Sequence, residues 1–237
     1  MVLKKKFRKI IPSHENTVES LRLGIILAMV GGFIDVYTYI SRGGVFANSE
    51  TGNIVLTAIG LAERNYTVVF NSTMQITFFI LGSLVSEIFR RRREKKNRDK
   101  IYHAKKVLLV EAIILLIVGF IKEDYPHIIV NAAIGFISAI QISAFTTLVD
   151  SPYTTTICTG NLRHLAENLF RAVETKDRVI IARFLRYVII ILAFSIGAVL
   201  GGYLTNLMRV KSIFIAVVFV MIAYGMLHRD ERKLVNN

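Results

Sequence analysis

The stretch that decides the fold class is residues 187–208, which read YVIIILAFSIGAVLGGYLTNLM and contain no Asp, Glu, Lys or Arg. A helix of about 20 mainly apolar residues is long enough to cross the roughly 30 Å hydrocarbon core of a bilayer. From Ile189 to Phe194 apolar side chains occupy every side of the helix. Such helices are membrane spans or the centre of a much larger protein, so the stretch favours a membrane protein over a soluble one.

Five further stretches have the same character. They are residues 23–41, 65–86, 107–121, 125–149 and 212–227. Two of them contain a single carboxylate, Asp35 in the first and Glu111 in the third. Together with residues 187–208, these stretches predict an all-α integral membrane protein with six transmembrane helices.

The charge of the chain indicates how these helices are oriented. The 237 residues include 30 Lys and Arg against 17 Asp and Glu, a formal net charge of +13. A charge of this size often belongs to a nucleic-acid-binding protein, but half of the basic residues lie in two segments, 4–9 and 90–106. Lys and Arg in short loops stay on the cytoplasmic side. We therefore predict a cytoplasmic segment 1–20 and a cytoplasmic loop 90–106 that contacts anionic lipid headgroups, with no nucleic-acid partner.

The segment between the first two predicted spans is too apolar for a plain loop. The first span runs outward and the second, which ends near Phe89, runs inward, so both ends of residues 42–66 lie outside. The apolar stretch from Ile54 to Ala62 is too short to cross the membrane. A re-entrant or interfacial half-helix fits both facts, because irregular backbone at membrane depth must be buried in protein or line a wet cavity.

A repeat relates the two halves of the chain. The sequence Thr51-Gly52-Asn53 recurs as Thr159-Gly160-Asn161, and similar glycine-containing stretches flank both copies in the same order. We divide the chain into a first membrane repeat, 21–122, a second, 127–228, and a cytoplasmic tail, 229–237. With three spans in each half, the second copy enters from the opposite side, as in the inverted repeats of many transporters and channels.

The charges test this inversion. It places the residues after the second TGN motif on the cytoplasmic side, where six basic residues gather: Arg163, Arg171, Lys176, Arg178, Arg183 and Arg186. This agrees with the positive-inside rule, whereas Arg209 and Lys211 fall on the other side and disagree with it.

Each TGN motif is predicted to begin a short helix. The first N–H groups of a helix have no intrahelical partner and carry the positive end of its dipole. Thr51 or Asn53 would cap them, Gly52 would allow close approach, and the remaining N–H groups would bind an anion or water. Two such helix tips entering from opposite faces would meet near the membrane midplane. The alternative is that TGN is a capped helix start that only packs the halves together.

Asp35 is the most informative single residue, because a carboxylate within a span is costly and usually faces a partner or a wet cavity. It is either a proton- or cation-linked group with Glu50 or Arg42 nearby, or a structural residue that clamps the TGN turn. Gln141 would line the same cavity. Glu87 and Glu111 are expected to pair with arginines of the basic loop. The candidate substrate-binding residues are Asp35, Thr51, Gly52, Asn53, Gln141, Thr159, Gly160 and Asn161.

Signatures of catalysis are missing from the sequence. It contains no HExxH, GxSxG or phosphate-loop motif, and its five His residues lack ligand spacing. The single cysteine, Cys158, has no His at motif spacing and is expected to be a small packing residue. We therefore predict no catalytic residues, no metal site and no cofactor.

Several of these motifs together resemble a known family. Residues 31–35 (GGFID), 44–48 (GVFAN) and 51–53 (TGN), with Gln141, 154–156 (TTT) and 158–162 (CTGNL), are similar to the YoaK-type family of bacterial multi-pass membrane proteins of unknown function. The resemblance covers nearly all of the chain after Ser20. It implies a bacterial cell membrane location and supplies no substrate. Glu50 departs from the uncharged residue that is usual before the first TGN.

Two functions follow from these observations. The first is a transporter or channel that passes a small solute, anionic or proton-coupled, between the two repeats, with both termini in the cytoplasm. The second is a non-transporting membrane scaffold or regulator in which the TGN motifs are structural.

Overall fold

The computed structural model describes residues 17–95, 100–155 and 158–236, so most of the predicted N-terminal segment 1–20 lies outside the described residues. The chain is almost entirely helical. Its elements are η1 (Thr17–Glu19), α2 (Leu21–Ser41), α3 (Glu50–Ala62), α4 (Tyr66–Lys95), α5 (Lys100–Phe120), α6 (His127–Ala144), β1 (Thr147–Leu148), β2 (Ser151–Pro152), α7 (Cys158–Thr175), α8 (Arg178–Met208), η2 (Arg209–Ser212) and α9 (Ile213–Asn236).

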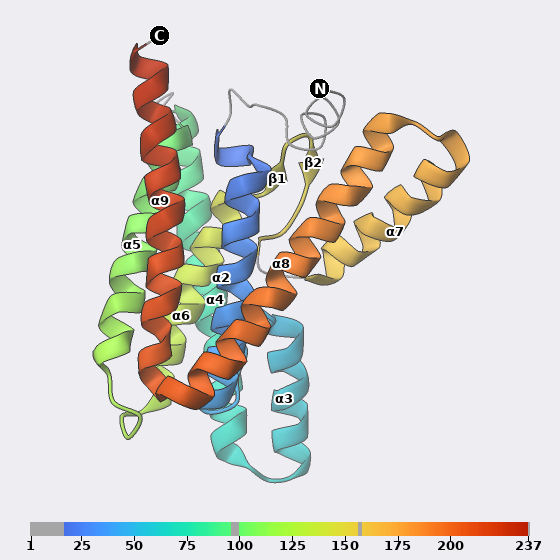
Figure 1. Ribbon diagram of the computed structural model, residues 1–237. Coiled ribbons are helices and arrows are strands. Elements are labelled where there is room, and N and C mark those ends of the chain that lie inside the picture. Colours follow the sequence, from blue (N-terminus) through green and yellow to red (C-terminus); the bar gives the residue numbers. More distant parts are fainter. Residues whose placement is uncertain (1–16, 96–99, 156–157, 237) are drawn as a thin grey trace.

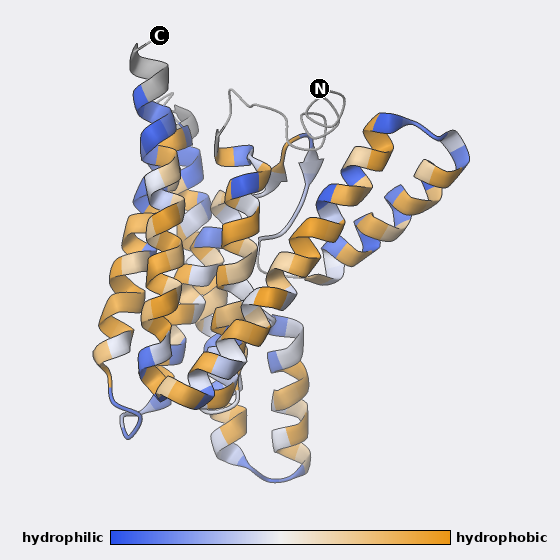
Figure 2. Ribbon diagram, in the orientation of Figure 1, coloured by the Kyte–Doolittle hydropathy of each residue, from blue (hydrophilic) through white to orange (hydrophobic). Residues whose placement is uncertain are grey.

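Four helical stretches within the described residues are long and apolar enough to cross a membrane. They are Leu21–Ser41, Tyr66–Arg92, His127–Ala144 and a continuous stretch, Arg178–Arg232, that joins α8 to α9 through η2. Helix α5 is not among them, because it carries Lys105, Lys106 and Glu111 along the first part of its length. Figure 2 shows apolar residues along the middle of the helices and hydrophilic residues gathered at their ends.

The described parts of the basic segment 90–106 are helical, so the connection between the second and third predicted spans extends the helices on either side of it. Helix α4 continues to Lys95 and α5 already begins at Lys100. Glu87 explains part of this extension, because its carboxylate accepts hydrogen bonds from Arg90 at 2.7 Å and Arg91 at 2.8 Å. Pairs three and four residues apart stabilise a helix. The predicted pairing of Glu87 with arginines is thereby confirmed.

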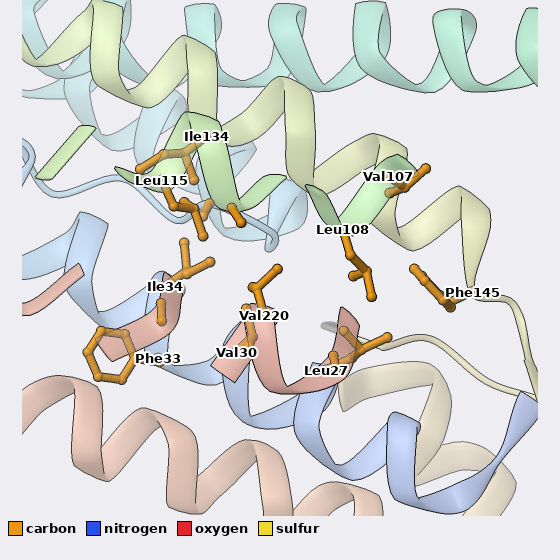
Figure 3. Close-up of a cluster of buried hydrophobic side chains, with 14 of the residues drawn as sticks. Leu27, Val30, Phe33, Ile34, Val107, Leu108, Leu115, Ile134, Phe145 and Val220 are labelled. Carbon is orange, nitrogen blue, oxygen red and sulfur yellow. The ribbon is translucent and has the colours of Figure 1, made fainter. Parts of the chain in front are cut away.

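The long helices pack as a bundle around an apolar core. Helix α2 packs on α8 and α9, α4 on α6, and α5 on α6 and α9. Side chains from these helices meet in the core, among them Leu27 and Ile34 of α2, Leu108 and Leu115 of α5, and Val220 of α9 (Figure 3). The core therefore joins helices from both halves of the sequence.

The two short helices project from the middle of this bundle. Helix α3 packs on α4, and α7 packs on α8. Both short helices begin about half-way along the bundle and run to opposite ends of it, α3 toward the α3–α4 turn and α7 toward the α7–α8 turn (Figure 1). The predicted half-helix over 54–62 is thus present as α3, which begins four residues earlier, at Glu50.

Glycines bring the crossing helices into close contact. A Cβ atom added at Gly197 of α8 would lie 2.1 Å from the carbonyl oxygen of Met29 in α2. At Gly82 of α4 it would lie 2.3 Å from the carbonyl oxygen of Phe136 in α6. Small residues are the usual means by which membrane helices approach closely. The glycines that flank the TGN motifs in sequence therefore lie at the α2–α8 and α4–α6 crossings.

An ion-pair cluster holds the extended segment that precedes α7. Asp150, in the turn between β1 and β2, accepts hydrogen bonds from Arg183 at 3.0 Å and from the largely buried Arg186 at 2.7 Å. Burial opposes ionisation of this carboxyl, but the hydrogen bonds from Arg183 and Ser151 hold the pKa of Asp150 below its ordinary value. The hydroxyl of Tyr187 donates to the carbonyl of Pro152 at 2.6 Å. These contacts fasten the chain to α8 before it turns back into α7.

Candidate functional site

The asparagine of the first TGN motif binds the backbone of the preceding loop. Oδ1 of Asn53 accepts from the N–H of Phe46 at 2.9 Å, and its Nδ2 donates to the carbonyl of Phe46 at 2.8 Å. Nδ2 also donates to Oε2 of Glu50 at 3.0 Å. The side chain is fully buried. Asn53 therefore fixes the loop that descends to the tip of α3.

The second TGN motif repeats this arrangement. Oδ1 of Asn161 accepts from the N–H of Thr154 at 3.2 Å, and its Nδ2 donates to the carbonyl of Thr154 at 2.8 Å. In both copies the bound residue lies seven positions before the asparagine. The same three letters therefore form the same local structure twice, at the first turn of α3 and of α7.

The other predictions for the TGN motifs are met only in part. Helix α3 is preceded by Ser49, and no side chain caps its N-terminus, so the expected cap by Thr51 or Asn53 was wrong. The reason is that Asn53 is already within the helix and turns its amide back to the loop. Gly52 does allow a close approach, since an added Cβ would lie 2.8 Å from the ring of Phe46. Thr51, Thr159 and Gly160 are exposed.

Asp35 lies at the same level and clamps the loop. Its Oδ1 accepts from the backbone N–H of Asn48 at 2.7 Å and from Nδ2 of Asn48 at 3.2 Å. Nδ2 of Asn48 also donates to the carbonyl of Gly31 at 3.3 Å. Asp35 is 6% exposed. The structural role that the sequence left open for Asp35 is therefore present, with Asn48 rather than Arg42 as its partner.

Asp35 also lies near the first residues of the two short helices. It is close enough to interact electrostatically with Glu50, which begins α3. It interacts in the same way with Cys158, which begins α7. The structure thus brings Asp35 and both TGN motifs to the middle of the bundle.

Arg42, the other suggested neighbour of Asp35, has a different task. Its guanidinium is completely buried and donates to the carbonyl oxygens of Val118, Ile121 and Lys122 at the end of α5, at 2.9 to 3.2 Å. Its Nε donates to the hydroxyl of Tyr37 at 2.9 Å. These carbonyls lie at the negative end of the helix dipole, so Arg42 caps the C-terminus of α5. Two of them also accept backbone hydrogen bonds, Val118 from Ile121 and Lys122 from Tyr125.

Sequence reasoning missed Gln75, which completes the site. This side chain of α4 is buried among apolar neighbours, packs over Gly135 of α6, and donates through Nε2 to the carbonyl of Ala47 at 3.1 Å. It holds the same loop as Asp35 and Asn53. Gln75 is the amide nearest the middle of the uncharged stretch 65–86, and that position is the signal that would have drawn attention to it.

Two other buried polar residues lie apart from this loop. Gln141 is buried on α6, and its Nε2 has no hydrogen-bond partner among the described residues. No hydrogen bond therefore links it to Asp35, beside which it was predicted to lie. Glu111 is 1% exposed on α5, and neither carboxylate oxygen has a hydrogen-bond partner in the described part of the chain. Its expected pairing with arginines of segment 90–106 was wrong, because Glu111 faces the apolar core.

The described residues contain no group of three His, Cys, Asp or Glu side chains arranged to hold a metal ion. What they do contain is a bundle of membrane-length helices with two short helices that begin about half-way along it (Figure 1). The fold and this site define an all-α membrane protein.

Comparison with known proteins identifies the family. The chain belongs to the family described as protein of unknown function (DUF1275), which matches residues 23–226. It is 29% identical over 160 residues to the UPF0700 transmembrane protein YoaK of Bacillus subtilis (strain 168), an alignment that covers 66% of this chain and 68% of that protein. The resemblance to a YoaK-type family is confirmed, and the family carries no assigned activity. No solved structure matches.

Proposed function

We propose that this protein is a six-span plasma-membrane protein built of two inverted repeats, residues 21–122 and 127–228, and that it passes a small solute between them. The observation that carries the proposal is that α3 and α7 both begin about half-way along the bundle (Figure 1), and that the buried Asp35 of α2 holds the loop before α3 through Asn48. Transporter sites are typically formed near the midplane, where half-helix ends from two repeats meet.

The packing of the helices supports the inverted repeats. Each helix of the first half has a counterpart in the second: α2 and α6, α3 and α7, α4 and α8, α5 and α9. If every helix is replaced by its counterpart, the list of helix pairs that pack together stays the same. The hydrogen bonds of Asn53 and Asn161 agree with this exchange, because Phe46 and Thr154 are separated by the same 108 residues as the two asparagines. In this scheme α5 and α9 are equivalent spans.

The charges support the orientation, with both termini in the cytoplasm. The basic residues of segment 90–106 and the end of α9 then lie on the same side, as the positive-inside rule requires. A polar hollow at this end of the bundle is lined by Arg90, Lys100 and His103 together with Ser86 and Glu19. Anionic lipid headgroups are the proposed partners of this basic surface. The proposal contains no chemical step, no cofactor and no nucleic-acid partner.

Flux through reconstituted protein tests the proposal. The full chain in liposomes should speed volume recovery after an osmotic challenge with at least one of potassium chloride, ammonium chloride, urea or glycerol, compared with protein-free liposomes. Asn53→Ala and Asn161→Ala should lower that rate about tenfold or more, the effect of about 1.4 kcal/mol on a barrier. Asn206→Ala is a matched control, because Asn206 is exposed on α8 and lies outside the TGN motifs.

The outcome separates transport from a structural role. If wild-type protein behaves as protein-free liposomes do, or if both variants keep normal flux while folded, the proposed pathway is removed. If both variants only lose thermal stability and wild type transports none of the probes, the TGN motifs are architectural and the scaffold is the better description.

A further inference from the structure

Three amide side chains at the loop that leads to α3 point their nitrogen atoms at oxygens of the loop and its neighbours. Nδ2 of Asn48 donates to Asp35 and to the carbonyl of Gly31. Nδ2 of Asn53 donates to Phe46 and Glu50, and Nε2 of Gln75 donates to Ala47. These bonds also fix the orientation of the Asn48, Asn53 and Gln75 amides. Each amide contacts a backbone carbonyl oxygen, which can only accept, so the atom facing it is the nitrogen.

Acceptors at the same loop are left over. Oδ1 of Asn48, Oε1 of Glu50 and Oε1 of Gln75 are buried, and none of the described residues donates a hydrogen bond to them. Asn48 and Gln75 are each 1% exposed. Buried polar atoms are nearly always satisfied, and an exception calls for an explanation such as a bound ion. Three orphaned oxygens beside the Asp35 carboxylate point to a ligand that is positive or donates hydrogen bonds.

The balance of charge indicates what that ligand is. Asp35 and Glu50 bring two carboxylates, and Arg42 is engaged at the far end of α2 with α5. With both carboxyls ionised, the N-termini of α3 and α7, which each contribute roughly half a positive charge, leave a net charge of about −1 at the site. Hard cations prefer oxygen ligands of the carboxylate and amide type.

We propose that the oxygens of Asp35, Asn48, Glu50 and Gln75 bind a small monovalent cation, sodium, potassium or ammonium, at the tip of α3. This inference rests on the proposed function and names the class of solute that the midplane site takes. It replaces the anion expected from the helix N–H groups, since the oxygens that surround this tip would repel one. The tip of α7 carries Cys158 where α3 carries Glu50, so the cation is held on the α3 side.

Thermal unfolding of the purified full chain in detergent tests cation binding without relying on flux. The protein is compared in sodium, potassium, ammonium and choline chloride at one ionic strength. A ligand that binds only the folded state at ten times its Kd raises the Tm of a chain of this size by roughly 3–6 °C. We expect this rise over choline with at least one of the three small cations.

Glu50→Gln should abolish the rise, because the amide keeps the shape of the side chain and removes its charge. Glu63→Gln is the matched control on the same helix, since Glu63 is exposed at the other end of α3, and it should keep the full rise. Gln75→Leu removes one orphaned oxygen and should weaken the rise without changing charge. Equal Tm values in all four chlorides, or an undiminished rise in Glu50→Gln, would overturn the proposal.

This result is distinguishable from failure of the proposed function. A cation-dependent Tm with no flux in liposomes leaves the cation site standing and removes transport. Flux of urea or glycerol with no cation-dependent Tm retains the pathway and removes the cation site.

Discussion

Arg42 shows how a single buried charge is accommodated at the end of a membrane helix. It has no carboxylate partner among its hydrogen bonds, which all go to three backbone carbonyls of α5 and one tyrosine hydroxyl. The carbonyls at a helix C-terminus are orphan acceptors, and Arg42 satisfies several at once. One side chain thereby ties the end of α2 to the end of α5.

Arg42→Met should destabilise the protein strongly. The substitution removes the side-chain hydrogen bonds to the carbonyls of Val118, Ile121 and Lys122, at a cost of about 2–4 kcal/mol, and Tm in detergent should fall by roughly 5–10 °C. Arg22→Met serves as the control on the same helix, because Arg22 is exposed, and it should leave Tm nearly unchanged. An equal fall in both variants would mean that the α5 cap contributes little.

Glu111 presents the opposite case, a buried carboxyl to which none of the described residues donates a hydrogen bond on either oxygen. Burying such a group costs free energy, so Glu111→Met should stabilise the protein by about 1–3 kcal/mol. The measurement is the Tm in detergent, with the exposed Glu63→Met as reference. A lower Tm in Glu111→Met would show that the carboxyl makes a stabilising interaction, and a stable variant without flux would place it on the solute pathway.

At the scale of elements, helix crossings depend on glycines whose role is visible only in the packed structure. Gly197 and Gly225 both lie within apolar helices, but only Gly197 belongs to the glycine-containing stretches that flank the TGN motifs. Gly197 faces the backbone of α2 at the crossing, whereas a Cβ added at Gly225 of α9 would meet nothing within 4 Å. The same residue type therefore permits a close contact in one helix and only weakens the other.

Gly197→Ala and Gly225→Ala should consequently act in opposite directions. The first forces α2 and α8 apart and should cost about 1–3 kcal/mol. The second should be neutral or add about 0.5–1 kcal/mol through helix propensity. Both are measured as Tm in detergent against wild type. If Gly197→Ala proved as stable as wild type, α8 would be free to shift along α2.

At the scale of the whole molecule, the two halves are proposed to enter the membrane from opposite sides. The turn after α3 and the turn after α7 lie at opposite ends of the molecule (Figure 1). Glu63 and Glu174, one beside each turn, are both exposed. Their accessibility in cells reports the orientation of each half directly.

Cysteine labelling tests this orientation. In a Cys158→Ser background, Glu63→Cys should react with a membrane-impermeant maleimide in intact bacterial cells whose outer barrier has been removed. Glu174→Cys should react only after the membrane is opened. Labelling of both cysteines from the same side would contradict the inverted repeats, and the reverse pattern would keep them but place the termini outside.

The sequence by itself determined the class of protein, the short helix at the first TGN motif and the relation between the two TGN motifs. It could do so because length, apolar composition and repetition are properties of the chain that need no partner. The tertiary structure alone decided that Asp35 bonds Asn48, that Gln75 holds the same loop, that Arg42 caps α5 and that Glu111 stands unpaired. Those outcomes depend on which faces of the helices pack together. The composition of an apolar segment does not say which way its few polar side chains point, so it cannot predict their partners.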